Sequence, residues 1–312
     1  MNSNNKSISI VSPVYQAEGI VDELVKRITN EVTKITKEFE IILVEDGSTD
    51  KSWQKIEENC KKDKRVKGIK LSRNFGQHYA ITAGLKVSQG DYVVVMDCDL
   101  QDNPKYIVEM YKKSKEGYDV IYTVKKVRKH SVIKNFFGVS FHRVFNWMIN
   151  DKGIQGNKQI GNFSLISRKV VDSFCKYPEY HRAYLNVIYW MGFSNAKITI
   201  KHDERYQGKT SYSFIKLITL ALDSIVSHSN KLLLVSIYTG FVFSMMGFIS
   251  IIYIIIKSIT YGYQPGWAST TVLIVFCTGL ILTSLGITGV YIGKIFEQVK
   301  HRPLYLIDKK LN

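Results

Sequence analysis

The stretch YVVVMDCDLQD, residues 92–102, joins an apolar run to a cluster of carboxylates. The run Tyr92–Met96 lacks polar alternation, which predicts a β-strand buried on both faces, as in a parallel sheet. Asp97 and Asp99 are two residues apart, so on an extended backbone both side chains project to the same side. Such a pair favours a divalent cation that bridges to a diphosphate. The alternative role for strand-end aspartates is to cap turns and helices.

The residues around this stretch alternate between short β-branched strands and helices. This order predicts an α/β doubly wound sheet, mainly parallel, with flanking helices. Ligands of such sheets bind beyond the carboxyl ends of the strands. The expected strands are Ile8–Val11, Phe39–Val44, Val66–Leu71, Tyr92–Met96 and Asp119–Thr123, and the expected helices are Gly19–Thr36, Ser52–Lys61, Gln77–Val87 and Pro104–Lys115.

Polar segments follow four of the expected strands, and we expect them to converge on one edge of the sheet. They are Ser12–Tyr15, Glu45–Ser48, Ser72–Gly76 and Asp97–Asp102. Gly47 and Gly76 are interpreted as turn glycines, and Cys98 is expected to face the core. The sequence contains no G-x-G-x-x-G and no Walker glycine-lysine pattern, which argues against dinucleotide oxidoreductases and P-loop enzymes.

Two uncharged runs near the end of the chain predict membrane-spanning helices. Leu232–Ile256 and Trp267–Gly293 both exceed the roughly 20 residues that a spanning helix needs. Buried core helices are the alternative, but they rarely reach this length without a charged residue. The link Lys257–Gly266 is expected to be a tight turn. The polar start of the chain does not resemble a signal peptide, so we expect the first 230 residues to stay on the cytoplasmic side.

Basic residues flank the two runs unequally. Lys231 precedes the first run and five basic residues follow the second, whereas the turn holds a single lysine. The positive-inside rule therefore predicts a multi-pass protein of the cell membrane with both ends cytoplasmic. The five are Lys294, Lys300, Arg302, Lys309 and Lys310.

The formal net charge of +16 calls for a partner or another purpose, and an anionic surface is one candidate. Basic and aromatic residues interleave over Ile121–Asn150, and an apolar helical pattern covers Ser213–Ser227. A protein held by two membrane spans faces anionic lipid permanently, so we expect contact with the lipid bilayer and no nucleic-acid partner. The four cysteines and seven histidines show no metal-ligand spacing, and no disulfide is expected.

Four motifs together resemble the family 2 glycosyltransferases with a GT-A fold. They are Val11–Tyr15, Glu45–Asp50, Leu71–Gly76 and Val95–Asp102. Residues 8–305 as a whole resemble the polyprenyl-phosphate glycosyltransferases, the branch similar to dolichyl-phosphate-mannose synthase and to bactoprenol glycosyltransferases. Bacterial members of that branch end in two membrane spans.

The resemblance implies an inverting hexosyltransferase that moves a sugar from a nucleotide diphosphate to polyprenyl (undecaprenyl) phosphate for modification of cell-envelope glycans. UDP-hexoses and UDP-N-acetylhexosamines are the expected donors, and GDP-mannose is less favoured. By resemblance, the catalytic residues are Asp97, Asp99 and Arg205. The nucleotide sugar is bound by Pro13, Tyr15, Asp46, Asp97 and Gln101, a Mg²⁺ or Mn²⁺ ion by Asp97, Asp99 and Gln101, and the acceptor phosphate by Arg128, Arg205 and Lys209.

One departure from the family pattern concerns the chemistry. The usual Gly-Asp-Phe-Arg is Gly161-Asn162-Phe163-Ser164, so this chain lacks a carboxylate sometimes interpreted as the base. An acceptor phosphate is largely dianionic at neutral pH and needs little help from a base, which makes the loss tolerable. Two other functions stay open: a subunit of a family 2 polysaccharide or O-antigen synthase, and a non-catalytic basic membrane scaffold.

The expected domain organisation has three parts. Residues 1–212 form the cytoplasmic catalytic domain, residues 213–230 a juxtamembrane amphipathic helix, and residues 231–312 a two-span hairpin with a short basic cytoplasmic tail. A homo-oligomer, dimer or tetramer, and a flippase are further expected partners. Small residues in the second span, such as Gly286 and Gly289, allow close helix packing.

Overall fold

The computed structural model describes residues 7–125, 160–180, 182–201, 231–261 and 266–312. The chain divides into two compact units, which we describe separately. The first consists of Met1–Ser131, Lys152–Thr210 and Arg302–Asn312, and the second of Val132–Asp151 and Ser211–His301. The expected interface helix 213–230 and most of the basic segment 121–150 lie outside the described residues.

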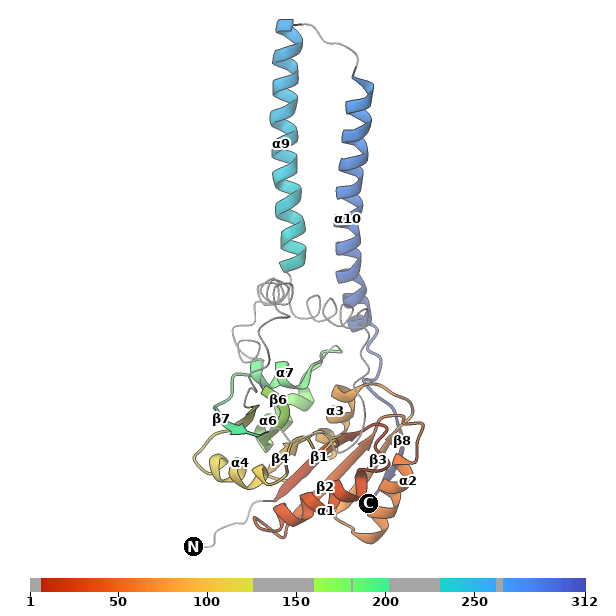
Figure 1. Cartoon of the computed structure of the whole chain (residues 1–312), viewed down its shortest axis with the longest axis vertical. Coiled ribbons are helices and arrows are strands. Elements are labelled where there is room, and N and C mark those ends of the chain that lie inside the picture. The colour runs from red at the N-terminus through yellow and green to blue at the C-terminus, as the bar shows by residue number, and fades with distance from the viewer. Residues whose placement is uncertain (1–6, 126–159, 181, 202–230, 262–265) are drawn as a thin grey trace, which may run out of the picture. The chain divides into compact units, whose positions relative to one another are not determined.

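In the described part of the chain, the first unit holds an eight-stranded sheet of order β7-β5-β6-β4-β1-β2-β3-β8 (Figure 1). Its strands are β1 (Ile8–Val14), β2 (Phe39–Glu45), β3 (Val66–Leu71), β4 (Tyr92–Val95), β5 (Val120–Lys125), β6 (Ile160–Ser167), β7 (Asn195–Ile200) and β8 (Ile307–Leu311). The helices of this unit are α1 (Val21–Val32), α2 (Ser52–Lys62), α3 (Gln77–Val87), α4 (Tyr106–Ser114), α6 (Arg168–Lys176) and α7 (Tyr184–Trp190).

The central strands are parallel, as the sequence predicts. β1 pairs in parallel with β2 and with β4, and β2 pairs in parallel with β3. Val14 is the register partner of Glu45, and Val11 is the partner of Val95, so these strands end near the same edge. β6 is antiparallel to β4 and β5, and β7 is parallel to β5. The carboxyl ends of β1, β2 and β4 therefore present their loops together.

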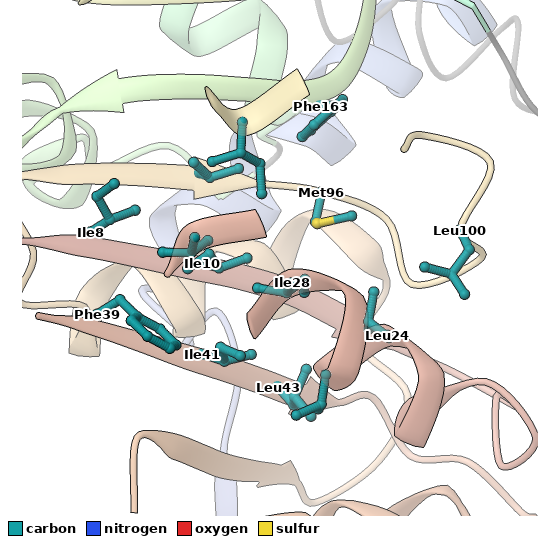
Figure 2. Close-up of a cluster of buried hydrophobic side chains, with 14 of the residues drawn as sticks. Ile8, Ile10, Leu24, Ile28, Phe39, Ile41, Leu43, Met96, Leu100 and Phe163 are labelled. Carbon is teal, nitrogen blue, oxygen red and sulfur yellow. The ribbon is translucent and has the colours of Figure 1, made fainter. Parts of the chain in front are cut away.

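Helices cover both faces of the sheet, which explains why its strands are apolar on both sides. Side chains of α1, α2 and α4 pack on one face, and those of α3, α6 and α7 pack on the other. α1 packs on the sheet because one of its faces is apolar. The buried residues of that face follow helical spacing and are Val21, Leu24, Val25, Ile28 and Val32. Figure 2 shows the first of these clusters, in which Met96 and Leu100, from the segment after β4, join residues of β1, β2 and α1.

The second unit contains two long apolar helices, α9 (Lys231–Tyr261) and α10 (Trp267–Val299). Lys231–Lys257 and Phe276–Val299 are long and apolar enough to cross a membrane, and neither window is buried. The hydroxyls of Ser236 and Ser284 lie 2.8 Å apart and join the two helices. α9 continues through Lys257 to Tyr261, so the expected turn at Lys257 is wrong. The residues after Lys257 are compatible with a helix, and the Thr260 hydroxyl donates to the carbonyl of Ile256.

The tail after α10 contributes the edge strand β8, which pairs antiparallel with β3. Asn312 Nδ2 donates to the carbonyls of Cys60 and Val66, at 2.9 and 2.8 Å. The sequence analysis assigns this tail to the hairpin and predicts no strand in it, whereas Arg302–Asn312 groups with the sheet. Most of β8 is exposed, so its sequence IDKKL has no apolar alternation that would reveal a strand.

Candidate active site

Asp46 holds together the loops that follow β2 and β3. Its carboxylate accepts hydrogen bonds from the N–H groups of Phe75 (2.8 Å, to Oδ1) and Gly76 (2.9 Å, to Oδ2). Its own N–H donates to the carbonyl of Val14 at 2.9 Å, which ties in the end of β1. Asp46 is 3% exposed, and this burial raises the pKa of its carboxyl although the two N–H donors oppose the shift. The carboxylate thus fixes the loop after β3.

Gly47 makes this close approach of two loops possible. Its φ is +68°, in the left-handed region that favours glycine, and a Cβ there would lie 2.3 Å from the backbone nitrogen of Asn74. Gly76 also has a positive φ, of +106°, just before α3 begins. Gly47 thus acts as a turn glycine, as predicted, whereas Gly76 is the N-cap residue of α3.

The segment after β1 is joined to the segment after β2. The N–H of Gln16 donates to the Ser48 hydroxyl at 3.0 Å, and the N–H of Ala17 donates to the Ser52 hydroxyl at 2.9 Å. Between these anchors and the strand, Tyr15 is 47% exposed, whereas Pro13 is buried within β1. Tyr15 therefore presents an aromatic surface next to the loops held by Asp46.

Asp97 follows β4 and is the most perturbed carboxylate of this edge. It accepts a 2.7 Å hydrogen bond from Gln77 Nε2 at the start of α3, and a further side-chain hydrogen bond from Asn162. Burial, followed by the charges of Asp99 and Asp102, raises the pKa of Asp97 to about 6, although Asn162 and Lys125 oppose the shift. Carboxylates that repel one another in a partly buried site favour a bound cation.

One cation from the protein already lies among these acids. Lys125, the last residue of β5, has its Nζ 3.8 Å from Oδ1 of the buried Asp102. Gly161 leaves room for this lysine, because a Cβ there would lie 3.1 Å from Lys125 Cε. The sequence analysis counted Lys125 in the basic segment Ile121–Asn150 that is expected to contact lipid, because a basic residue at the end of a strand has no distinctive pattern.

The loop after β4 is anchored by the residues between its acids. Leu100 has a φ of +58° yet is 2% exposed, so its side chain holds a strained backbone against the core. Cys98 also packs on the core, as predicted, and its sulfur accepts a hydrogen bond from the N–H of Tyr15. Burial raises the pKa of its thiol to about 12. The N–H of Gln101 donates to Asp99 Oδ1 at 3.1 Å, which closes the loop.

The donor set at this loop suits a cation that is shared with a substrate. No group of three or more His, Cys, Asp and Glu side chains in the described residues could hold a metal ion by itself. Mg²⁺, however, is usually bound by one or two carboxylates, with phosphate and water oxygens in its other positions. Asp97 and Asp99 supply the carboxylates and Gln101 an amide oxygen, so these residues fit such an ion. Arg128, Arg205 and Lys209 lie outside the described residues.

A model of a protein family, glycosyl transferase family 2, matches residues 9–173, which contain all four loops. The chain belongs to glycosyltransferase family 2. The uncharacterized glycosyltransferase YkcC of Bacillus subtilis is 36% identical over 98% of this chain and 95% of its own length. An undecaprenyl-phosphate 4-deoxy-4-formamido-L-arabinose transferase of Shewanella sediminis is 31% identical over 98% of this chain and 93% of its own.

Solved structures of other glycosyltransferases share the fold. Glucosyl-3-phosphoglycerate synthase from Mycobacterium tuberculosis, determined with Mn²⁺, UDP and glucosyl-3-phosphoglycerate, has a TM-score of 0.51 at 15% identity. The likeness covers 71% of this chain and 78% of that one. Mannosyl-3-phosphoglycerate synthase from Rubrobacter xylanophilus also has a TM-score of 0.51, at 16% identity, over 71% of this chain and 73% of its own. The family 2 glycosyltransferase described here therefore has the expected GT-A-like fold.

Proposed function

We propose that this protein transfers a hexose or N-acetylhexosamine from its UDP derivative to undecaprenyl phosphate, with inversion at the anomeric carbon. The observation that carries the proposal is the convergence of the loops after β1 to β4, joined through Asp46 and Gln77, on the carboxylates of Asp97 and Asp99. The printed activity of the Shewanella relative supports a polyprenyl-phosphate acceptor. Two candidate membrane spans would keep the enzyme beside such a lipid.

On the donor side, the loop held by Asp46 and the exposed ring of Tyr15 would enclose the nucleobase and ribose, with Pro13 supporting them from β1. Asp97, Asp99 and Gln101 would hold Mg²⁺ or Mn²⁺ against the diphosphate. When bound, this ion supplies positive charge that stabilises the departing diphosphate. Burial and the charges of Asp99 and Asp102 raise the pKa of Asp97, and a bound cation would offset both effects, which supports this role.

On the acceptor side, a phosphate oxygen of the lipid would attack the anomeric carbon as the bond from that carbon to the diphosphate oxygen breaks. UDP leaves with the bonding electron pair. The second pKa of a phosphomonoester is about 6, so the attacking oxygen is already ionised at neutral pH and no side-chain base is needed. Asn162 cannot serve as one, since an amide does not accept a proton in this range. Arg128, Arg205 and Lys209 would offset the charge of the acceptor phosphate.

The proposal includes a membrane topology for the enzyme. Both ends of the chain and residues 1–212 would lie in the cytoplasm, residues 213–230 would lie along the lipid surface, and the hairpin within 231–312 would cross the cell membrane twice. A dimer or tetramer of this chain and a flippase for the lipid-linked product are further proposed partners. Nucleic acid is not among them.

The test is to incubate the purified full-length protein with undecaprenyl phosphate, Mn²⁺ and each of UDP-glucose, UDP-N-acetylglucosamine, UDP-galactose and GDP-mannose. We expect one of the UDP-sugars to give undecaprenyl phosphate that carries a single sugar, seen as a mass increase of one sugar residue. Products with a growing number of sugars would favour a polysaccharide synthase. Absence of both product and UDP binding would favour a non-catalytic scaffold, and either result would overturn the proposal.

A further inference from the structure

Two neutral amides converge on the Asp97 carboxylate, one from the start of α3 and one from β6. Gln77 Nε2, at the start of α3, lies 2.7 Å from Asp97 Oδ1, and the side chain of Asn162, on β6, donates a second hydrogen bond. These two donors carry no charge. Lys125, whose charge also acts on Asp97, has its Nζ 3.8 Å from Oδ1 of Asp102. A neutral donor fixes the direction of a carboxylate while leaving its charge available to a cation.

A bulge in β6 brings Asn162 to this position. Tyr122 of β5 is the register partner of Ser164, but Val124 is the partner of Ile160, so three residues of β6 oppose the single Thr123. The Thr123 hydroxyl donates to the Phe163 carbonyl at 2.6 Å, and the Ser164 hydroxyl donates to the Asn162 carbonyl at 2.9 Å. Bulges commonly redirect a side chain toward a site. Here hydrogen bonds to the carbonyls of Asn162 and Phe163 hold the bulge, and the pairing of Ile160 with Val124 bounds it on the other side.

Gln77 is held with similar rigidity by the residues around it. The preceding Gly76 donates its N–H to Asp46 Oδ2 at 2.9 Å. The next residue, His78, accepts the N–H of Tyr184 at its Nδ1, and the Tyr79 hydroxyl donates to the carbonyl of Tyr180 at 3.0 Å. A chain of contacts therefore runs from Asp46, beside the proposed nucleobase site, through Gln77 to Asp97.

We propose that Gln77 and Asn162 are positioning residues, which orient the Asp97 carboxylate for the divalent cation of the nucleotide complex. This inference rests on the proposed function, because it needs a cation at Asp97. It assigns a role to the position where the family pattern has an aspartate: Asn162 donates a hydrogen bond and accepts no proton. A carboxylate at that position would repel Asp97 and could not donate to it while ionised.

The experiment measures Mn²⁺ binding to the full-length protein saturated with UDP, from the EPR signal of the free ion. Gln77→Met keeps the length and apolar stem of the side chain but removes its amide, and Asn162→Ala removes the other donor. We expect each variant to bind Mn²⁺ about 10- to 100-fold more weakly, the usual cost of removing a hydrogen bond to a metal ligand. Gln54→Ala, at an exposed glutamine of α2, is the matched control and should bind as the wild type does.

UDP affinity in EDTA separates positioning from a general structural defect. Because Gln77 and Asn162 act through Asp97, both variants should bind metal-free UDP within about twofold of wild type. The inference is overturned if Mn²⁺ affinity is unchanged in both variants, or if metal-free UDP binding falls as much as Mn²⁺ binding. Failure of the proposed function has different signatures. The wild type would bind neither UDP nor Mn²⁺ if the protein were a non-catalytic scaffold, whereas a polysaccharide synthase would bind both but give products with several sugars.

Discussion

The N–H of Gly76 lies 2.9 Å from Oδ2 of Asp46, and this contact joins the end of β2 to the start of α3. Asp46→Asn keeps one acceptor oxygen and replaces the other with a donor that faces an N–H group. We expect a loss of about 1–3 kcal/mol in the free energy of unfolding, the usual cost of an unsatisfied buried group. UDP affinity should fall as well, because the loop after β3 is released. Urea denaturation and UDP titration measure the two effects, and unchanged values for both would contradict this account of the loop.

Gly47→Ala should be far more damaging than Gly117→Ala. Both glycines have a positive φ, +68° and +98°, so both substitutions strain the backbone by about 1–2 kcal/mol. Only at Gly47 does the new methyl group also meet a backbone atom, the nitrogen of Asn74 at 2.3 Å, whereas at Gly117 nothing lies within 4 Å. The difference between the two losses, measured by thermal unfolding, isolates the contact between the loops. Equal losses would show that this contact is unimportant.

Asp99→Asn should abolish transfer while the protein still folds. The substitution removes a metal ligand, which costs several kcal/mol of charge stabilisation in the transition state, and Asp99 is only half-buried, so packing is kept. Product formation from a UDP-sugar is measured together with circular dichroism. EDTA should likewise abolish the transferase activity of the wild type, and added Mn²⁺ should restore that activity. Full activity in EDTA would remove the metal from the mechanism.

Arg205→Lys tests the acceptor side. Lysine keeps the charge but loses the planar fork that grips two phosphate oxygens, so we expect turnover to fall substantially while UDP affinity stays near that of the wild type. Steady-state kinetics with varied undecaprenyl phosphate, alongside UDP titration, make the comparison. Weaker UDP binding with normal acceptor kinetics would place Arg205 on the donor side instead.

Glu40 should make the stability of the sheet depend on acid pH. Its carboxylate accepts hydrogen bonds from Ser9 Oγ at 2.6 Å and the N–H of Gln89 at 2.7 Å, and it pairs with Lys67. Burial alone would raise the pKa of Glu40, but these partners lower it below its ordinary value. The folded state therefore binds this proton more weakly than the unfolded state does. The stabilisation is present above the ordinary pKa, about 4.3, and is lost as the pH falls through the lower folded value.

Glu40→Gln should accordingly reduce the free energy of unfolding by about 1–2 kcal/mol at pH 7. Below pH 5, the stability of this variant should depend less on pH than that of the wild type. Glu31→Gln is the control, because Glu31 of α1 pairs with the exposed Lys34 and such surface pairs add little stability; its stability curve should follow that of the wild type. Urea midpoints measured between pH 3 and 7 give both curves. If the urea midpoints of Glu40→Gln and of the wild type fall equally steeply below pH 5, Glu40 does not couple protonation to folding.

The sequence predicted the elements whose apolar pattern is continuous. The first nine strands and helices, from β1 to β5, were predicted to within a few residues, because the strands are short apolar runs and the helices bury residues at helical spacing. β6 was not predicted, since Gly161, Asn162 and two serines interrupt its apolar run where the bulge lies. β8 was missed for a related reason, because an exposed edge strand carries charges in place of a core pattern.

In the candidate site, too, some residues could be predicted from sequence patterns and others could not. Asp46, Asp97 and Asp99 were found because carboxylates at strand ends form a recognisable pattern, and the structure brings their loops together. Gln77 was interpreted only as the first residue of a helix, and Asn162 only as a missing base. Their contacts with Asp97 depend on how α3 and the β6 bulge pack, which no local pattern encodes. The roles proposed for these three aspartates stay predictions, as do those of Pro13, Tyr15, Gln101, Arg128, Arg205 and Lys209.

The pairing of β8 with β3 has a consequence for the order in which this chain is made. Gly68 of β3 leaves the ribosome early, but its partner, Leu311, follows only after both apolar helices have been synthesised. During that interval the edge of β3 is an open strand, which can pair with other chains. Completion of the sheet must therefore wait for translation of the hairpin. Chains that stall at the membrane should be the ones that aggregate or are degraded.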